Sequence, residues 1–172
     1  FYVGSSGKTV IQRMLDNFAA KIAPYRETIQ QRGYTIDQTV ILASIIQGEA
    51  ANAKDMKGVS RVLQNRLAPG SGFDKLQCDS TTMYVNGVLP KVDGITVTSS
   101  AYDTYTRQGL PVGAINNPGT EAIDAALNPS EDAEHVKAYF FATDYKTGIT
   151  YFNETYTQHV KTCRKYRIGM YG

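Results

Sequence analysis

The most regular hydrophobic pattern in the chain predicts a helix that begins near Thr35. Apolar residues recur there at the spacing of one helical face, which indicates a stripe that faces the core. The stripe consists of Ile41, Leu42, Ile45 and Ile46. Thr35, followed three residues later by Gln38, is the capping-box pattern typical of a helix start. We therefore expect a helix from Thr35 to about Ala51.

Glu49 lies on the same side of this predicted helix, three to eight residues after the members of the stripe. Burial of a carboxylate disfavours its charged form and raises its pKa. A glutamate can then stay protonated near neutral pH and act as a general acid. The alternative is a buried Glu49 that forms a structural ion pair with an Arg or Lys, since such pairs also perturb pKa values. The pattern leaves both interpretations open.

Two further helices are predicted in the first 72 residues. An amphipathic pattern precedes the stripe and ends at Gly33, and Pro24 inside it is expected to kink or split the helix. Another helix follows and stops at residues 69–72. Asn65 and Arg66 near its end are expected to join helix to loop. The apolar positions are Ile11, Leu15, Phe18, Ile22, Tyr25 and Ile29 in the first, and Met56, Val59, Leu63 and Leu67 in the second.

The second half of the chain predicts one long irregular segment and a compact end. Residues 73–119 are polar and rich in turn residues, and only short pieces such as 94–98 resemble strands. A long irregular stretch inside a compact domain is typical of a functional surface, and we expect this one to form a cleft.

After this segment, the pattern predicts a short helix around residues 123–127 and a hairpin of residues 137–143 and 149–152. Thr155 is expected to cap a last helix. The predicted fold is therefore α+β, a helix-rich single domain with a small antiparallel sheet or hairpin and the long cleft-forming segment.

Composition excludes several classes of protein. At 172 residues and 42% hydrophobic, the chain is long enough for one domain with a core. Its net charge of +2, without a run of Lys or Arg, does not indicate nucleic-acid binding. The longest apolar run, residues 40–46, is much shorter than the roughly 20 residues of a membrane span. The chain opens at Phe1, and we expect it to be a domain excised from a longer protein.

Cysteine and histidine usage does not predict a metal site. The two cysteines, Cys78 and Cys163, lie far apart in sequence and could form a disulfide or be unrelated. Together with two distant histidines they lack the spacing of metal ligands, so no structural zinc is predicted.

A series of short strings, in order along the chain, carries a family resemblance. They are LASIIQGE at 42–49, NRL at 65–67, LQCDST at 76–81 with Tyr84, SAYDTY at 100–105, GLP at 109–111, GAI at 113–115, NPG at 117–119, YFF at 139–141, and Phe152 with His159. In this order they resemble the endolytic murein transglycosylase family, also called YceG-like. The resemblance covers nearly the whole chain.

The resemblance implies a lyase that cleaves the β-1,4 bond between N-acetylmuramic acid and N-acetylglucosamine in peptidoglycan without water. Glu49 matches the family's single catalytic glutamate, which acts first as acid and then as base. The muramic C6 hydroxyl is the internal nucleophile and leaves a 1,6-anhydro end. One carboxylate then suffices, whereas ordinary glycosidases need two. No cofactor and no metal ion is implied.

Other motif residues are implied to lie near the substrate. Gln77, Asp79 and Thr81 are expected to line the cleft or to support Glu49 from behind; the alternative is a polar turn whose side chains bind backbone groups. Tyr102 and Tyr105 are expected to stack on sugar rings or bind acetamido groups, or to pack beneath the long segment.

The chain departs from the family's motifs at three positions. Gln47 replaces a glutamate, Ser80 replaces the proline of the family's LQTDPT string, and Asp103 replaces the asparagine of its YNTY string. A carboxylate at position 103 could raise the pKa of Glu49 or act as a second acid, but we expect Asp103 to position substrate or Glu49. Asn117, in the NPG turn, is placed with the substrate-binding or supporting residues.

The family also implies a setting for the parent protein. A transmembrane segment and a LysM-like module are expected before residues 1–34, which form the opening loop and first helix, and residues 35–172 form the catalytic core. Action outside the cytoplasmic membrane, on glycan strands beside the cell-wall synthesis machinery, is implied. The competing functions are a peptidoglycan hydrolase that uses Glu49 with Asp79 or Asp103, and an inactive wall-binding domain.

Overall fold

The structure is a computed structural model that describes residues 4, 6–88 and 98–169. The chain divides into two units, Phe1–Ile36 and Asp37–Gly172, and each is described by itself. Among the described residues, no helix combines the length and the apolar character needed to cross a membrane.

The first unit contains two helices joined by a tight turn. The two α-helices are α1 (Gly7–Ile22) and α2 (Arg26–Gln31), and the 3₁₀ helix η1 (Ala23–Tyr25) forms the turn between them. Pro24 lies in η1, where it lacks the N–H that a continuous α-helix needs, so the predicted split is confirmed. The unit's helices end near Gly33, as predicted, and this glycine has a left-handed φ of +71°.

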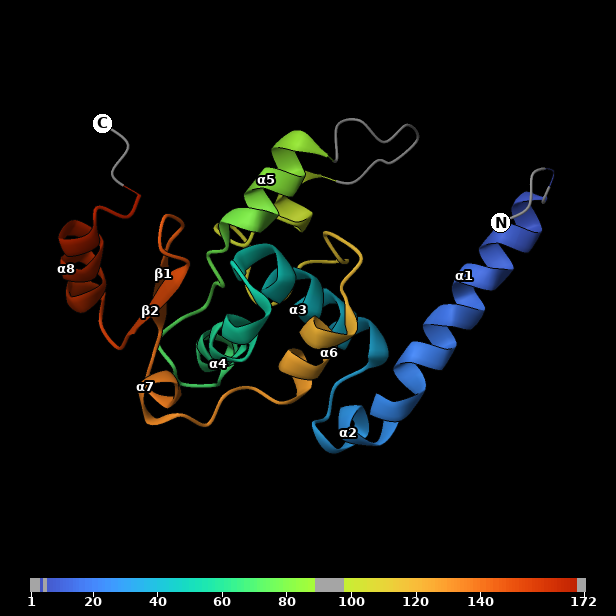
Figure 1. The fold of residues 1–172 in the computed structure, drawn as a ribbon, viewed down its shortest axis with the longest axis horizontal. Helices are drawn as coiled ribbons and strands as arrows, with labels where there is room; N and C mark the ends of the chain where they lie inside the picture. The colour runs from blue at the N-terminus through green and yellow to red at the C-terminus, as the bar shows by residue number, and fades with distance from the viewer. Residues whose placement is uncertain (1–3, 5, 89–97, 170–172) are drawn as a thin grey trace. The chain divides into compact units, whose positions relative to one another are not determined.

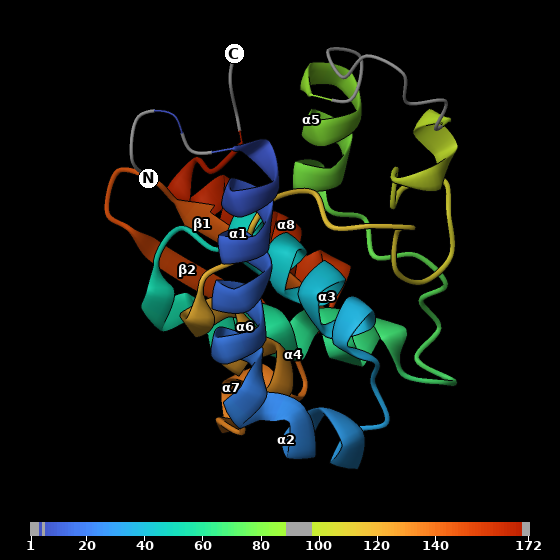
Figure 2. The same cartoon turned by 90° about the vertical axis from the view of Figure 1, so that its right-hand side faces the viewer.

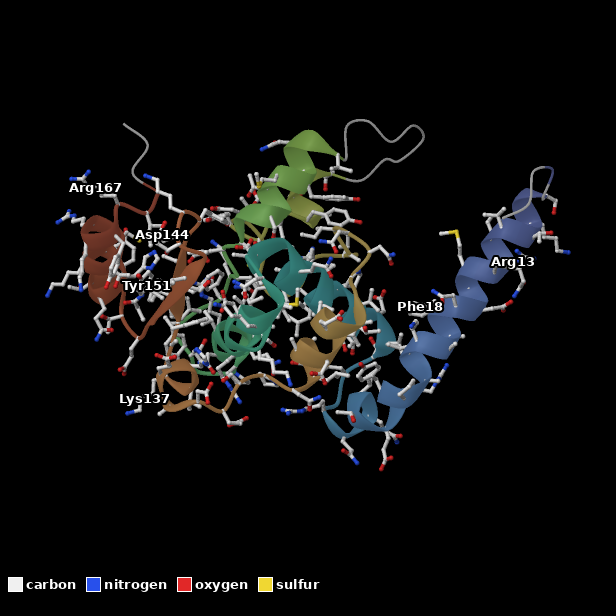
Figure 3. All side chains as sticks on the ribbon, viewed as in Figure 1. Arg13, Phe18, Lys137, Asp144, Tyr151 and Arg167 are labelled. Atoms are coloured by element: carbon white, nitrogen blue, oxygen red, sulfur yellow. The ribbon has the colours of Figure 1, made fainter. Side chains whose placement is uncertain are left out.

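Only part of the apolar face predicted for the first unit is buried. Ile22 and Ile29 are buried, whereas Ile11 and Leu15 are exposed. Phe18 also belongs to the exposed part and projects from α1 (Figure 3).

The second unit is helix-rich with one small sheet, which confirms the predicted α+β class. The elements of its described residues are α3 (Ile36–Glu49, beginning at the boundary), the 3₁₀ helix η2 (Ala53–Asp55), α4 (Met56–Leu67), α5 (Asp79–Gly87), the 3₁₀ helix η4 (Ser99–Ala101), α6 (Thr120–Leu127), α7 (Ala133–Val136), β1 (Phe140–Asp144), β2 (Ile149–Asn153) and α8 (Tyr156–Tyr166). In both views α3 lies between α4 and α5 (Figures 1 and 2).

Helix α3 is a central helix and not the one-sided amphipathic helix that its sequence predicted. Residues 41–46 are all buried, and Thr39 is buried as well. A helix that is apolar around its whole circumference is one that neighbours cover on several sides. The helix ends at Glu49, two residues before the predicted end, so the carboxylate follows the buried segment instead of lying within one apolar stripe.

The prediction that residues 73–119 are irregular was wrong for α5. Its first residues, Asp79, Ser80, Thr81 and Thr82, are weak helix formers, and for this reason the pattern did not indicate a helix. Contacts with distant residues at its first turn stabilise it instead, as described below. Most of the predicted extended piece at 94–98 lies outside the described residues, and Thr98 is not in a strand.

The closing hairpin and last helix are confirmed. Strands β1 and β2 pair antiparallel, with Thr143 opposite Thr150, and the two hydroxyls are 3.0 Å apart. Thr155 and Gln158 form a complete capping box at the start of α8, which packs against the hairpin (Figure 1). The short helix α6 occupies the predicted region, and α7 is an additional turn that the sequence pattern did not indicate.

Candidate active site

The end of α3 meets the start of α5 at Glu49 and Ser80. The backbone N–H of Ser80 donates a hydrogen bond of 2.8 Å to Oε1 of Glu49. Gly48 permits this approach, since a Cβ there would lie 2.8 Å from the Cβ of Ser80, closer than real Cβ contacts. The Glu49 carboxylate therefore satisfies one of the free N–H groups in the first turn of α5.

The pKa of Glu49 is raised above its ordinary value, as the sequence predicted. Burial is the largest cause; the hydroxyl and the N–H of Ser80 lower the pKa, the negative charge of Asp79 raises it, and the positive charge of Arg66 lowers it. In the part of the chain that the structure describes, no ion pair includes Glu49. A structural ion pair is therefore not the reason for its burial.

Two buried threonines fix the turn that leads into α5. The Thr81 hydroxyl donates to the Cys78 carbonyl at 2.7 Å, and it lies 2.9 Å from the hydroxyl of Thr104. Thr104 Oγ1 in turn accepts the Cys78 N–H at 2.9 Å. Both threonine side chains are fully buried, so Thr81 supports the first turn of α5 and does not line a cleft.

Gln77 and Arg66 hold the residues just before this turn. Gln77 has a φ of 55°, a left-handed value that costs a non-glycine residue about 1 kcal/mol. Its N–H donates to the Thr104 carbonyl, and its side chain is exposed. The guanidinium of Arg66 is buried and donates to the carbonyls of Leu76 and Tyr139, which agrees with the structural role predicted for it.

A chain of hydrogen bonds connects Asp79 to Asp103 through Tyr105. The Tyr105 hydroxyl donates to Asp79 Oδ1 at 2.6 Å, and the Tyr105 N–H donates to Asp103 Oδ1 at 2.9 Å. Burial and then Asp79 raise the pKa of the Tyr105 phenol. Asp103 is not among the groups that shift the pKa of Glu49. Asp79, Tyr105 and Asp103 thus form a polar edge beside the first turn of α5.

Tyr102 packs against neighbouring residues. Its ring centroid lies 5.0 Å from that of Tyr84, and a Cβ at Gly113 would lie 2.7 Å from its hydroxyl oxygen. Packing beneath the long segment, the alternative for this tyrosine, is therefore what these contacts favour.

Asn117 is exposed in a loop that is bound to α3 on both sides. Asn116 Nδ2 donates to the Ser44 carbonyl at 2.9 Å, and the Gly119 N–H donates to Gln47 Oε1 at 2.7 Å. The loop therefore holds Asn117 beside the last turns of the helix that carries Glu49.

A surface hollow lies away from the predicted site residues. It has a volume of about 440 Å³ and lies between α7, the end of β2 and α8. The cleft predicted at Glu49 stays a prediction. Among the described residues, no three His, Cys, Asp or Glu side chains gather closely enough to hold a metal ion, and Cys78 and Cys163 are free thiols.

Comparison with known proteins identifies the family of this chain. The sequence pattern of the YceG-like family matches residues 1–165. The chain belongs to the YceG-like family. A crystal structure of a YceG-like protein from Listeria monocytogenes superposes with a TM-score of 0.78 at 30% identity, over 94% of this chain and 52% of that one.

Curated relatives of this YceG-like chain are named endolytic murein transglycosylase. That of Bacillus subtilis strain 168 is 28% identical over 167 residues, which are 94% of this chain and 43% of the relative. That of Streptococcus pneumoniae strain D39 is 24% identical over 159 residues, which are 88% of this chain and 28% of the relative. The chain therefore spans less than half the length of these relatives.

Sequence reasoning missed two residues of this site. Ser80 was noted only as a replacement for proline, although that replacement supplies the N–H that binds Glu49. Thr104 lay inside a matched string but showed no signal of its own, because its partners Thr81 and Cys78 are more than 20 residues away.

Proposed function

We propose that this domain cleaves peptidoglycan glycan strands as an endolytic lytic transglycosylase, with Glu49 as the single acid and base. The observation that carries the proposal is the Glu49 carboxyl at the end of a buried helix, with a raised pKa and with no ion pair to any residue that the structure describes. The names of the relatives, endolytic murein transglycosylase, support the substrate and the reaction class.

The proposed reaction needs no water and no cofactor. Protonated Glu49 gives its proton to the glycosidic oxygen as the bond from C1 of N-acetylmuramic acid to that oxygen breaks. The ionised carboxylate then takes the proton of the muramic C6 hydroxyl, whose oxygen forms a new bond to C1. The products are a 1,6-anhydro end and a free 4-hydroxyl on N-acetylglucosamine, and Glu49 is again protonated.

The surrounding residues have proposed supporting roles. Thr81, through Cys78 and Thr104, fixes the start of α5 and with it the donor to Glu49. Asp79 and Tyr105 lie next to that donor and are exposed, which suits contact with sugar hydroxyl and acetamido groups. Gln77 and Asn117 are exposed and are also proposed to face substrate, and Tyr102 to hold the loop beneath it.

A hydrolase is the second candidate because this chain has Asp103 where the family's string has asparagine. The hydrogen bonds from Asp103 through Tyr105 to Asp79 place two further carboxylates on one polar edge, next to the residue that binds Glu49. Either could activate water as the general base, the second carboxylate of a glycosidase. Reducing muramic ends in the products would then replace anhydro ends.

The setting of the parent protein follows from the proposed substrate. We infer action on the extracytoplasmic side of a bacterial membrane, where glycan strands are made and cut, and work beside the cell-wall synthesis machinery. An anchor and a LysM-like module in the parent protein are part of the same proposal.

The test is product analysis by mass spectrometry of purified glycan strands digested with wild type and with Glu49→Gln. We expect internal cuts with anhydro-muramic ends in wild type and none in the variant. Reducing ends that depend on Glu49 would favour the hydrolase. Unchanged cutting in Glu49→Gln would reject the catalytic assignment, and binding without cutting in wild type would favour a wall-binding domain.

A further inference from the structure

We propose that Ser80 is the positioning residue that sets the proton affinity of Glu49, with its backbone N–H and its hydroxyl as two separate donors to the carboxylate. This inference rests on the proposed role of Glu49, and it adds a residue that controls when that glutamate holds its proton.

The first donor is the N–H of Ser80, 2.8 Å from Oε1 of Glu49. Ser80 is the second residue of α5, so this N–H has no partner within its own helix. Glu49 is the acceptor that a helix capping residue would otherwise supply. Cys78, which precedes α5, makes no side-chain cap for this helix.

The second donor is the Ser80 hydroxyl. Its oxygen is buried and has no hydrogen-bond partner among the described residues, which is costly for a hydroxyl. It lies near enough to Glu49 to lower the pKa of that carboxyl, although its present rotamer does not complete a hydrogen bond. A change of rotamer about the Cα–Cβ bond would turn it to the carboxylate once Glu49 has lost its proton.

The two oxygens of Glu49 then have different roles. Oε1 accepts the N–H throughout, so it is the carbonyl oxygen of the protonated acid, and the proton rests on Oε2. When Oε2 delivers that proton, the Ser80 hydroxyl donates a hydrogen bond to the carboxylate and stabilises its new negative charge. The same hydroxyl turns back when the carboxylate recovers a proton.

Other charged or titratable groups also interact with Glu49, and the Ser80 variants leave their side chains unchanged in identity. Arg66 on α4 lowers the pKa of Glu49 and Asp79 at the start of α5 raises it, while the charge of Glu49 raises the pKa of Cys78 and of Tyr105. None of them donates a hydrogen bond to Glu49 among the bonds of the described residues. Ser80 is therefore the group whose removal tests direct donation.

The experiment is a titration of Glu49 by NMR on protein labelled with ¹³C at the glutamate carboxyl, assigned by comparison with Glu49→Gln. Ser80→Ala removes the hydroxyl and keeps the N–H, and Ser80→Pro removes both. Proline is tolerated in the first turn of a helix. We expect the titration midpoint to rise by about half a pH unit in Ser80→Ala and by about one in Ser80→Pro, because each lost donor favours the protonated form.

Thr157→Pro is the matched control, since Thr157 is also the second residue of a helix, α8, and is exposed. It should leave the titration of Glu49 unchanged. Equal midpoints in wild type and Ser80→Ala, or in Ser80→Ala and Ser80→Pro, overturn the proposal. If Ser80→Pro does not fold, the wild-type protein tests whether the Ser80 N–H donates to Glu49. In that case the NMR chemical shift of the Ser80 amide proton must change with pH at the same midpoint as the Glu49 carboxyl.

In the Ser80 variants, the pH at which the cleavage rate falls on the alkaline side should rise by the same amount as the titration midpoint of Glu49. A purely structural role of Ser80 would not cause this shift. The proposed function can fail separately. If Glu49→Gln cleaves as well as wild type, the function fails even when the midpoints move. If Glu49→Gln is inactive and the midpoints do not move, only the role of Ser80 fails.

Discussion

Gly48 on α3 faces Ser80 on α5 so closely that a Cβ on Gly48 would lie 2.8 Å from the Cβ and 3.2 Å from the hydroxyl oxygen of Ser80. The side chain of Ser80 cannot move away freely, because it is attached to the first turn that binds Glu49. The absence of a side chain at position 48 thus allows the two helices to meet at the candidate site.

Gly48→Ala should push the start of α5 away from α3. We expect a loss of about 1–3 kcal/mol in the free energy of unfolding from overpacking, partly offset by the better helix propensity of alanine. Glycan cleavage should fall at least about tenfold, because the donor to Glu49 is displaced. Gly87→Ala is the control, since nothing lies near its added Cβ. Equal activity of the two variants would contradict the prediction.

Glu49→Gln should reduce glycan cleavage by about 10³-fold or more, since the same group serves as acid and base. Glutamine keeps an oxygen that can accept the Ser80 N–H, so the fold should be retained. The rate of anhydro-end formation is the measurement, and circular dichroism checks the fold. Glu121→Gln, an exposed carboxylate on α6, should cleave like wild type.

The raised pKa of Glu49 also predicts how stability depends on pH. A carboxyl whose pKa is higher in the folded state favours folding below its unfolded pKa, and this contribution is lost as pH rises through the folded pKa. Glu49→Gln removes that dependence. The melting temperature of the variant relative to wild type should therefore be higher at pH 8 than at pH 4. A difference that stays constant with pH would contradict the raised pKa.

Asp103→Asn separates the two candidate reactions. Asparagine keeps an oxygen for the Tyr105 N–H, so the local turn should persist. For a lytic transglycosylase we expect anhydro ends from both proteins and a change in rate of less than about tenfold, as befits a positioning residue. Reducing ends from wild type that disappear in Asp103→Asn would show instead that Asp103 activates water.

Thr81→Val should destabilise the domain by about 1–3 kcal/mol, because it removes the hydroxyl that binds the Cys78 carbonyl and the Thr104 hydroxyl and takes the acceptor from the buried Thr104 N–H, while it keeps the shape of the side chain. Urea denaturation measures the change. Thr157→Val, at an exposed position of α8, should stay within about 0.5 kcal/mol of wild type. If the free energy of unfolding falls no more in Thr81→Val than in Thr157→Val, the buried threonine network does not stabilise the domain.

Elements with local signals could be predicted from the sequence. Pro24 divides the first helices because it lacks an N–H, and Thr155 with Gln158 caps α8 through bonds only three residues apart. The hairpin of β1 and β2 follows from two apolar runs around a turn with Gly148. Each of these is decided by interactions within a few residues.

Helix α5 could not be predicted in the same way. Its first turn is held by Glu49, which lies 31 residues before Ser80, and by Thr104, which lies 23 residues after Thr81. The prediction of a one-sided amphipathic helix for α3 was wrong for a related reason. The sequence pattern showed an apolar face, but it did not show on how many sides neighbouring elements cover the helix. Long-range contacts decide both features.

The sequence by itself determined that a helix carries Glu49 near its end, that burial raises the pKa of this carboxyl, and which motifs indicate the family. Only the tertiary structure decided what that carboxyl binds. Gly48, inside the predicted helix, and Ser80 and Thr104, inside the predicted irregular segment, carry no signal of this contact in the sequence. Their importance arises from close approach between separate segments. A pattern along one segment records burial, whereas a hydrogen bond between segments depends on how the chain brings them together.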